Sequence, residues 1–310
     1  MSDFLSKTKA VVLGHALADA IGVPVEFKSR YELERSPVRD MTGYGTHNKP
    51  KGTWSDDTSM SLATIDSLKS GIDYDDMMQK FCDWLYGAKY TANDVVFDVG
   101  NTTRSALMAY KVLKLSPLEC GEKDGYSNGN GSLMRIHPVC LYLYNLKLPT
   151  KNKIKIIEEV SALTHAHARS KTGCGIYAFV LWELLNAPEK ASVIKGLEKA
   201  KKFYQERDEI NIYHRLFESD FITKPKEFIK STGYVVHTLE SAIWCLLNTE
   251  NYTDCILKAI NLGDDTDTVG AVAGGLAGAL YGIEGIPNNW LKQLLKKEYI
   301  EELCQKTFSK

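Results

Sequence analysis

Two short segments of this sequence gather carboxylate and hydroxyl side chains in a way that could bind a metal ion. They are TWSDDT at residues 53–58 and GDDTDT at residues 263–268, and each directly precedes a helical apolar pattern. Helix capping would explain a single Asp at such a place, because its oxygens accept bonds from the free N–H groups of a first turn. Adjacent carboxylates, in contrast, repel one another unless a cation offsets them. Oxygen ligands without Cys or clustered His suit a hard divalent cation such as Mg²⁺, Mn²⁺ or Ca²⁺.

The two acidic segments could also complete one another. Positions i and i+2 of an α-helix diverge by about 200°, so Asp265 and Asp267 can face one point only where the chain is still entering the helix. If the two segments meet in space, their carboxylates could hold two ions. Each segment alone is also compatible with capping, but together they favour a metal site.

Two further acids lie next to helical patterns and could take part in proton transfer. Glu26 follows the helical pattern 8–21 and stands between Val25 and Phe27. It could be a partly buried general acid or base, a further metal ligand, or a surface residue of a loop. Asp98 precedes another helical pattern and could be its N-cap or an acid of the site. The local sequence leaves these alternatives open.

Residues 127–135, SNGNGSLMR, predict a tight loop, because Asn and Gly tolerate positive φ. Successive free N–H groups at the start of the helix that follows could cradle an anion such as pyrophosphate, although a simple turn explains the same residues. The loop is neither a Walker A loop nor a Rossmann fingerprint. His165 and His167 lie two positions apart and diverge on a helix, so at most one of them faces a pocket.

Helices are the elements that must position these side chains, since apolar residues mostly recur with a 3.6-residue period. This pattern is present at residues 8–21, 58–69, 75–86, 173–185, 235–247 and 290–303. The two strand candidates, 142–146 and 234–237, also fit helices. No Ser/Gly/Pro linker divides the chain, so we expect one all-α domain over residues 1–310, with the polar stretch 204–232 as a surface excursion.

A glycine stripe marks the expected centre of the fold. Gly270, Gly274, Gly278 and Gly282 recur every four residues. Each glycine costs about 1 kcal/mol against Ala in a helix interior, so the stripe needs a packing reason. Glycines remove side chains from one face and allow a second helix to approach closely. We therefore predict a buried central helix over residues 265–283.

The composition of the whole chain excludes several classes of protein. With 38 basic and 39 acidic residues the formal net charge is −1, which argues against a nucleic-acid partner and a long acidic tail. The seven cysteines are odd in number and form no CxxC pair, as expected for reduced thiols in a cytoplasmic protein. No signal peptide and no run of about 18 apolar residues is visible, so no membrane span is expected.

From about residue 10 to residue 300, the chain resembles the ADP-ribosylglycohydrolases, the family of dinitrogenase-reductase-activating glycohydrolase and the ADP-ribosylarginine hydrolases. The matching segments follow the order of the family's motifs, and they are 14–27 with its PVEF end, 52–60, 98–103, 128–135, 164–165 and 263–270. The DDT and GDDTDT motifs, with NGNGS between them, are the most specific part of the resemblance.

The resemblance implies a compact single-domain orthogonal helical bundle that is an enzyme of the ADP-ribosylglycohydrolase type. Such an enzyme hydrolyses the glycosidic bond that links ADP-ribose to a protein side chain, and so reverses mono-ADP-ribosylation. The Asp98 segment points to arginine as the modified residue. The implied cofactors are two divalent cations, Mg²⁺ or Mn²⁺. The implied partner is an ADP-ribosylated protein, the product is ADP-ribose, and a monomer is favoured.

The resemblance also implies roles for particular residues, motif by motif. The metal ligands would be Ser55, Asp56, Asp57, Asp265, Asp267 and Thr268. The general acid or base would be Glu26 or Asp98. The residues that hold the substrate would be Gly100, Ser127, Asn128, Gly129, Asn130, Gly131, Ser132, Met134 and His165.

Three other functions fit the same residues. The first is hydrolysis of another ADP-ribose linkage, to serine, in O-acetyl-ADP-ribose or on nucleic acid. The second is a non-catalytic module that binds ADP-ribose, although the presence of every proposed metal ligand counts against it. The third is a helical scaffold whose aspartates only cap helices.

Overall fold

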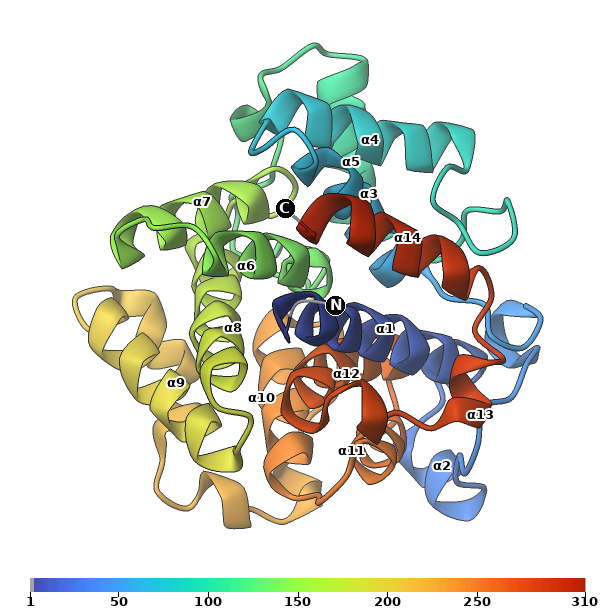
Figure 1. Cartoon of the computed structure of the whole chain (residues 1–310). Helices are drawn as coiled ribbons and strands as arrows, with labels where there is room; N and C mark the ends of the chain where they lie inside the picture. The colour runs from blue at the N-terminus through green and yellow to red at the C-terminus, as the bar shows by residue number, and fades with distance from the viewer. Residues whose placement is uncertain (1–2, 310) are drawn as a thin grey trace.

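Residues 3–309 are described in a computed structural model, and they form fourteen α-helices and eight 3₁₀ helices (Figure 1). The α-helices are α1 (Asp3–Gly22), α2 (Arg30–Arg35), α3 (Asp56–Leu68), α4 (Tyr74–Gly87), α5 (Asn101–Lys111), α6 (His137–Tyr144), α7 (Thr150–Ala162), α8 (Ala168–Asn186), α9 (Lys190–Tyr204), α10 (Val235–Leu247), α11 (Tyr252–Ile260), α12 (Thr266–Tyr281), α13 (Asn288–Leu291) and α14 (Lys297–Phe308). The 3₁₀ helices are η1 (Val23–Val25), η2 (Gly45–His47), η3 (Pro117–Glu119), η4 (Leu133–Arg135), η5 (Asp208–Phe217), η6 (Phe221–Thr223), η7 (Lys226–Phe228) and η8 (Ile283–Gly285). Between residues 3 and 309 the extended pairings are isolated bridges only, so the all-α prediction is confirmed.

Helices α1 and α12 form the central pair of the fold, and the glycine stripe is the reason they can pack so closely. A Cβ atom added at Gly274 would lie 2.4 Å from the carbonyl oxygen of Gly14, and one added at Gly278 would lie 2.1 Å from that of Ala10. The predicted close approach of a second helix is therefore confirmed. The prediction was wrong for Gly282, which ends α12 with a φ of 69° instead of continuing the stripe.

Helix α1 also bears on the expectation that no segment spans a membrane. By length and apolar composition alone, this helix could cross a bilayer. The sequence contains no uninterrupted apolar run of that length, because polar residues are spread along the helix. A buried core helix has the same properties, and 94% of its most apolar window is buried inside the protein. The apolar surface of α1 is thus covered by the rest of the chain.

The remaining helices enclose this central pair (Figure 1). Helices α14 and α3 pack together beside α1, while α10 and α11 pack against α12. Helix α8 lies beside the central pair, where it packs against α12, and it also packs against α7 and α9. One hydrophobic core extends from Leu5 to Phe308, as a one-domain organisation requires. All seven cysteines are buried and free, which agrees with the reduced thiols expected from the sequence.

Two local expectations need adjustment. The helical pattern at residues 290–303 is interrupted between α13 and α14, where the N–H of Leu295 donates to the carbonyl of Gly52 at 3.1 Å and Lys296 adopts a left-handed φ of 47°. This turn ties the C-terminal region to the segment that precedes α3. Both strand candidates lie in helices: 142–146 overlaps the end of α6, and 234–237 overlaps the start of α10.

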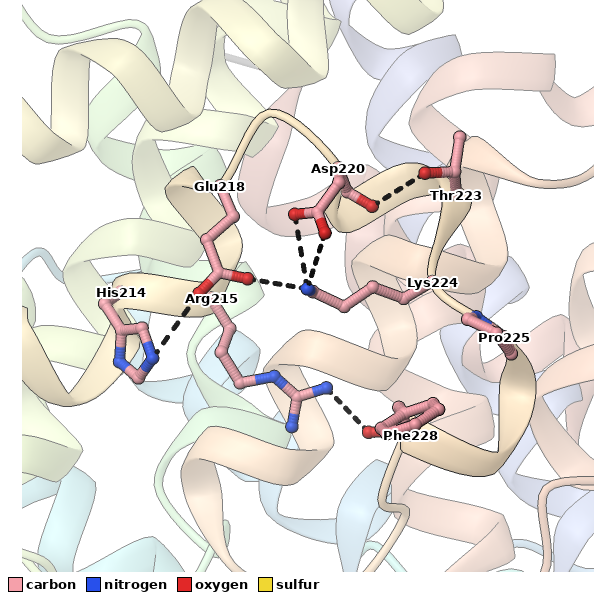
Figure 2. A pocket seen from close by; sticks show the side chains of 8 residues that line it. All are labelled: His214, Arg215, Glu218, Asp220, Thr223, Lys224, Pro225 and Phe228. Atoms are coloured by element: carbon pink, nitrogen blue, oxygen red, sulfur yellow. Dashed lines mark hydrogen bonds and ion pairs between the residues drawn. The ribbon is translucent and has the colours of Figure 1, made fainter.

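The polar stretch 204–232 is a surface excursion with its own anchoring contacts (Figure 2). Lys224 pairs with Glu218 at 2.7 Å and with Asp220 at 3.1 Å, and Arg215 donates to the carbonyl of Phe228 at 2.6 Å. These groups line a cavity of about 380 Å³. Lys224 is paired with two carboxylates and Arg215 with Glu240 at 3.5 Å, so both cations already have partners. These contacts anchor the loop, and they do not indicate a binding site.

Candidate metal centre and active site

A cavity of about 250 Å³ opens where the N-terminal ends of α3 and α12 meet. It is lined by Glu26, Phe27, Asp56, Asp98, Gly100, Asn101, Thr102, Thr103, Gly129, Asn130, Gly131, Met134, His165, Gly233, Asp265 and Thr268. The two acidic segments, the acids at 26 and 98 and the glycine-rich loop are therefore brought to one place, although they are up to 242 residues apart in the chain.

Direct hydrogen bonds join the two acidic segments. The Oδ2 atom of Asp57 accepts from the Ser55 hydroxyl at 3.0 Å and from the Thr268 hydroxyl at 3.2 Å. The side-chain amide of Asn130 donates to Asp265 Oδ2 at 2.9 Å, which connects the glycine-rich loop to the same cluster. The convergence that the metal hypothesis required is present.

The chain enters α12 in a conformation that lets Asp265 and Asp267 serve one cluster. Gly263 and Asp264 have φ values of 82° and 60°, so the backbone turns sharply before the first helical residue. Asp265 occupies the N-cap position, yet its side chain makes no capping bond. Capping therefore does not explain this carboxylate. The carbonyl of Asp264 also accepts from the N–H of Phe27 at 2.7 Å, which holds the neighbouring Glu26 close to Asp265.

A buried acid that the sequence analysis missed supports the start of α3. Asp19 of α1 accepts from the N–H of Ser55 at 2.9 Å and from the hydroxyl of Thr58 at 2.6 Å. Burial raises the pKa of Asp19 to about 7, although these hydrogen bonds act in the opposite direction. The sequence offers one indication that this acid is buried: Asp19 is the only acid in the apolar run 13–21. Ser55 is the N-cap of α3, so Asp56 and Asp57 are not needed for capping.

The carboxylates of the cluster are buried without the partners that such groups need. Burial raises the pKa of Asp57 and Asp267 well above the usual range, and neighbouring carboxylates raise both further. Asp57 Oδ1, Asp265 Oδ1 and Asp267 Oδ2 accept no hydrogen bond. Across residues 3–309 no Lys or Arg pairs with any of these three acids. Unpaired buried carboxylates are costly, so this oxygen-only donor set fits divalent cations.

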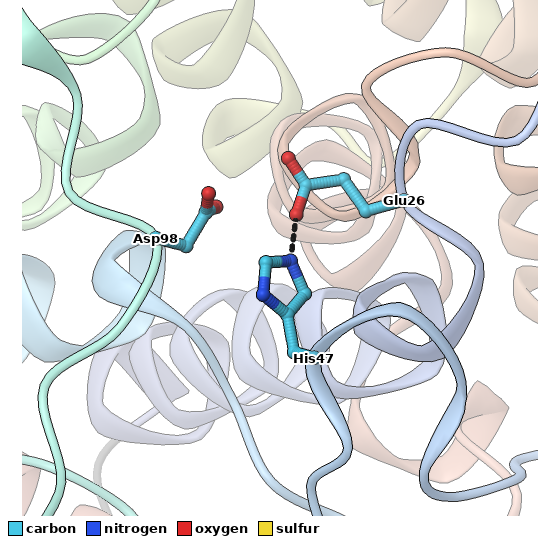
Figure 3. A group of neighbouring side chains, drawn as sticks. All are labelled: Glu26, His47 and Asp98. Carbon is cyan, nitrogen blue, oxygen red and sulfur yellow. Dashed lines mark hydrogen bonds and ion pairs between the residues drawn. The ribbon is translucent and has the colours of Figure 1, made fainter.

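Glu26 and Asp98 face one another at the mouth of the cluster (Figure 3). Glu26 is only 3% exposed, and burial followed by the charge of Asp98 raises its pKa to about 10. The N-cap of α5 is Gly100, so Asp98 is not a cap, and burial raises its pKa too. His47 of η2 binds Glu26 through Nε2 and was not foreseen. Its turn, GYGTHN, carries no local pattern that reveals what the imidazole faces.

The glycine-rich loop lies against His165, on the other side of the cavity. A Cβ atom at Gly131 would be 2.8 Å from Cε1 of His165, so any other residue would have to displace the imidazole. His165 Nδ1 is 2.9 Å from the hydroxyl of Thr164. The other ring nitrogen, Nε2, points toward Gly129. His167 instead caps α8 by accepting from the N–H of Arg169 at 3.1 Å. As expected, only one of the two histidines faces the pocket.

Three residues expected to hold substrate do not line the cavity. The Ser127 hydroxyl bonds to the carboxylates of Glu122 and Asp124 at 2.6 and 2.7 Å. The side-chain amide of Asn128 donates to the carbonyl of Gly125 at 2.9 Å. Ser132 is fully buried, 2.9 Å from the Ser161 hydroxyl. In a tight turn, successive side chains leave on different sides, so these three shape the loop while Gly129, Asn130 and Gly131 line the cavity.

The chain belongs to the ADP-ribosylglycohydrolase family, whose model matches residues 1–310. It is 34% identical to the ADP-ribosylarginine hydrolase Tri1 of Serratia proteamaculans, over 99% of this chain and 80% of that protein. It is 31% identical to the ADP-ribosyl-[dinitrogen reductase] glycohydrolase of Rhodospirillum rubrum, over 91% of this chain and 88% of that protein. A solved structure described as an ADP-ribosylglycohydrolase-related protein complex superimposes with a TM-score of 0.84 at 29% identity, covering 100% of this chain and 99% of that chain.

Proposed function

We propose that this protein hydrolyses the bond between ADP-ribose and arginine side chains of a modified protein, at the carboxylate cluster between α3 and α12. The observation that carries the proposal is the set of buried, unpartnered oxygens on Asp57, Asp265 and Asp267, together with Glu26, whose carboxylate lies within 4.8 Å of ligand oxygens of Asp265 and Asp267. Relatives that are named as hydrolases of ADP-ribosylarginine and of ADP-ribosylated dinitrogen reductase support it.

The cluster would hold two divalent cations, Mg²⁺ or Mn²⁺. Their ligands would be Ser55, Asp56, Asp57, Asp265, Asp267 and Thr268, which supply only oxygen donors. When bound, the cations would supply positive charge that orients the ribose hydroxyls and acidifies water. The glycine-rich loop and His165 form the opposite wall, where amide groups can meet the diphosphate.

Glu26 and Asp98 are placed to move the protons that the reaction requires. Their carboxyl oxygens lie within 4.8 Å of one another, and burial together with the charge of Asp98 raises the pKa of Glu26, so the protonated form of Glu26 is favoured. Such a pair offers one acid to protonate the departing nitrogen and one base to receive a proton from the attacking water. The acids Glu26 and Asp98 at the mouth of the cluster also complement the cationic guanidinium of arginine better than the neutral hydroxyl of serine.

Substrate choice and metal dependence can be tested together. With Mg²⁺ present, we expect release of ADP-ribose from an ADP-ribosylated arginine peptide, and loss of this release in EDTA with recovery on adding Mg²⁺. An ADP-ribosyl-serine peptide, O-acetyl-ADP-ribose and ADP-ribosylated DNA serve as comparison substrates. Release from serine but not from arginine would reject the acceptor, and turnover in EDTA would reject the cations. Tight binding of ADP-ribose without any turnover would identify a binding module instead.

The two acids can be separated by substitution. We expect Glu26→Gln and Asp98→Asn each to lower turnover by on the order of 10²- to 10⁴-fold, the usual contribution of a positioned acid or base. The variant that loses the proton donor should recover part of its rate on an ADP-ribose derivative whose leaving group departs without a proton. Glu198→Gln, an exposed position of α9, is the control and should retain full turnover. If both variants keep wild-type rates, neither acid carries the proton.

A further inference from the structure

One cluster at the mouth of the site differs in chemistry from the metal centre below it. Glu26, His47 and Asp98 converge from three separate segments, and one ligand atom of each lies within 4.8 Å of the others (Figure 3). The deeper cluster offers carboxylate and hydroxyl oxygens only, whereas this one contains an imidazole nitrogen. The three side chains approach a common point from three sides.

The imidazole of His47 is held in place by its surroundings. Thr46 donates its hydroxyl to the backbone carbonyl of Glu26 at 2.7 Å, so η2 is tied to the segment that carries this acid. The ring of His47 lies 5.1 Å from the ring of Phe97 and 6.0 Å from that of Phe27, measured between centroids. The side chain is mostly shielded, with 15% of its surface exposed. Its Nε2 therefore has little freedom to turn away from Glu26.

A hydrogen bond between His47 and Glu26 would by itself need only these two residues. The third side of the cluster is closed by Asp98, whose backbone adopts a positive φ of 55° at the turn into α5. Asp is one of the few non-glycine residues that adopts this conformation readily, so the turn places the carboxylate at little cost. Two carboxylates and one imidazole around one point form a donor set typical of transition-metal cations, while oxygen-only sets favour Mg²⁺.

We infer that Glu26, His47 and Asp98 form a second site for a divalent cation of borderline hardness, of the Zn²⁺ class, at the edge of the oxygen-only centre. Glu26 lies between the two, since its carboxylate is also within 4.8 Å of ligand oxygens of Asp265 and Asp267. Its selectivity comes from the imidazole, since nitrogen ligands favour Zn²⁺ over Mg²⁺. A cation there occupies both acids that the proposed function uses for proton transfer. Resting on that function, the inference adds that Zn²⁺ inhibits the hydrolase through His47 even when Mg²⁺ is saturating.

Binding is the primary test, because it does not depend on hydrolysis. In protein saturated with Mg²⁺, equilibrium dialysis should find one tightly bound Zn²⁺ per chain. His47→Gln should weaken this binding by at least about 10-fold, as loss of a ligand does. His165→Gln removes the other imidazole of the same cavity and should leave Zn²⁺ affinity unchanged. Equal Zn²⁺ affinity in wild type and His47→Gln would overturn the inference. A thermal shift with Mg²⁺ in each variant verifies that the deeper centre remains folded.

The ligand itself can be identified with Co²⁺ as a paramagnetic probe of the same site. Ring protons of a coordinated imidazole shift far outside the normal proton NMR range. We expect such signals in wild type and in His165→Gln, their loss in His47→Gln, and their disappearance when Zn²⁺ is added. Signals that vanish with His165 instead, or none in wild type, would refute the site. If hydrolysis is absent while His47-dependent Zn²⁺ binding persists, the proposed function fails and the binding site stands.

Discussion

Replacing Asp267 with asparagine is expected to lower turnover by on the order of 10³-fold, a loss of about 4 kcal/mol of transition-state stabilisation. Asp267 is fully buried, and its Oδ2 atom has no partner. Asparagine keeps the shape of the side chain but removes a charge and one strong oxygen ligand. The remaining carboxylates would hold their cations weakly. The substitution should therefore lower turnover while the protein stays folded.

Thermal melting distinguishes this loss of a ligand from loss of structure. Wild type should gain about 5 °C on adding Mg²⁺ at roughly 100 times its dissociation constant. Asp267→Asn should lose most of this gain, and in EDTA it should melt no lower than wild type, because removing one of several crowded carboxylates relieves repulsion. Asp208→Asn, at an exposed position of η5, is the matched control and should behave as wild type. A variant that melts far below wild type in EDTA would show that Asp267 is structural.

The largest effect on stability is expected from Gly278→Ala. The added Cβ atom would lie 2.1 Å from the carbonyl oxygen of Ala10 and 2.7 Å from its carbonyl carbon. Both are backbone atoms of α1, so no side chain can move aside, and the central helices must separate. We expect a loss of at least about 3 kcal/mol in the free energy of unfolding, measured by urea denaturation.

The control for this substitution is Gly87→Ala, at the end of α4. A Cβ atom there would meet no atom within 4 Å, so the change should be neutral or stabilise by up to about 1 kcal/mol. If Gly278→Ala were equally harmless, the packing of α1 on α12 could not be as close as the backbone contacts indicate.

The sequence was informative wherever a function depends on residues that are close together along the chain. The acidic segments could be located because each combines carboxylates with a helix start, and the glycine period predicted the approach of a second helix. Residues that act across the fold were harder to find. Asp19 is a single acid in an apolar helix. Only the folded structure shows that its carboxylate accepts a hydrogen bond from the backbone N–H of Ser55. His47 lies in a turn whose partner, Glu26, comes from another segment.

Two residues depart from the geometry expected of their motifs for a different reason. Ser132 belongs to the loop that lines the cavity, yet its hydroxyl points into the core toward Ser161. Gly282 has the spacing of the stripe, yet it ends α12. In both cases the motif gave the right segment, and the side of the backbone on which a side chain leaves was decided by the three-dimensional packing.

The pairing of α1 with α12 determines when this protein can begin to work. The ribosome makes Gly14 first and reaches its contact Gly274 only 260 residues later. At synthesis rates of about 5–20 residues per second, the apolar helix α1 waits roughly 13–50 s for its partner. Until then Asp265 and Asp267 have not been synthesised, so a nascent chain lacks two ligands of the proposed cation site. A chain truncated before α12 should therefore be inactive and prone to aggregation, because the apolar surface of α1 stays exposed, and it should depend on chaperones.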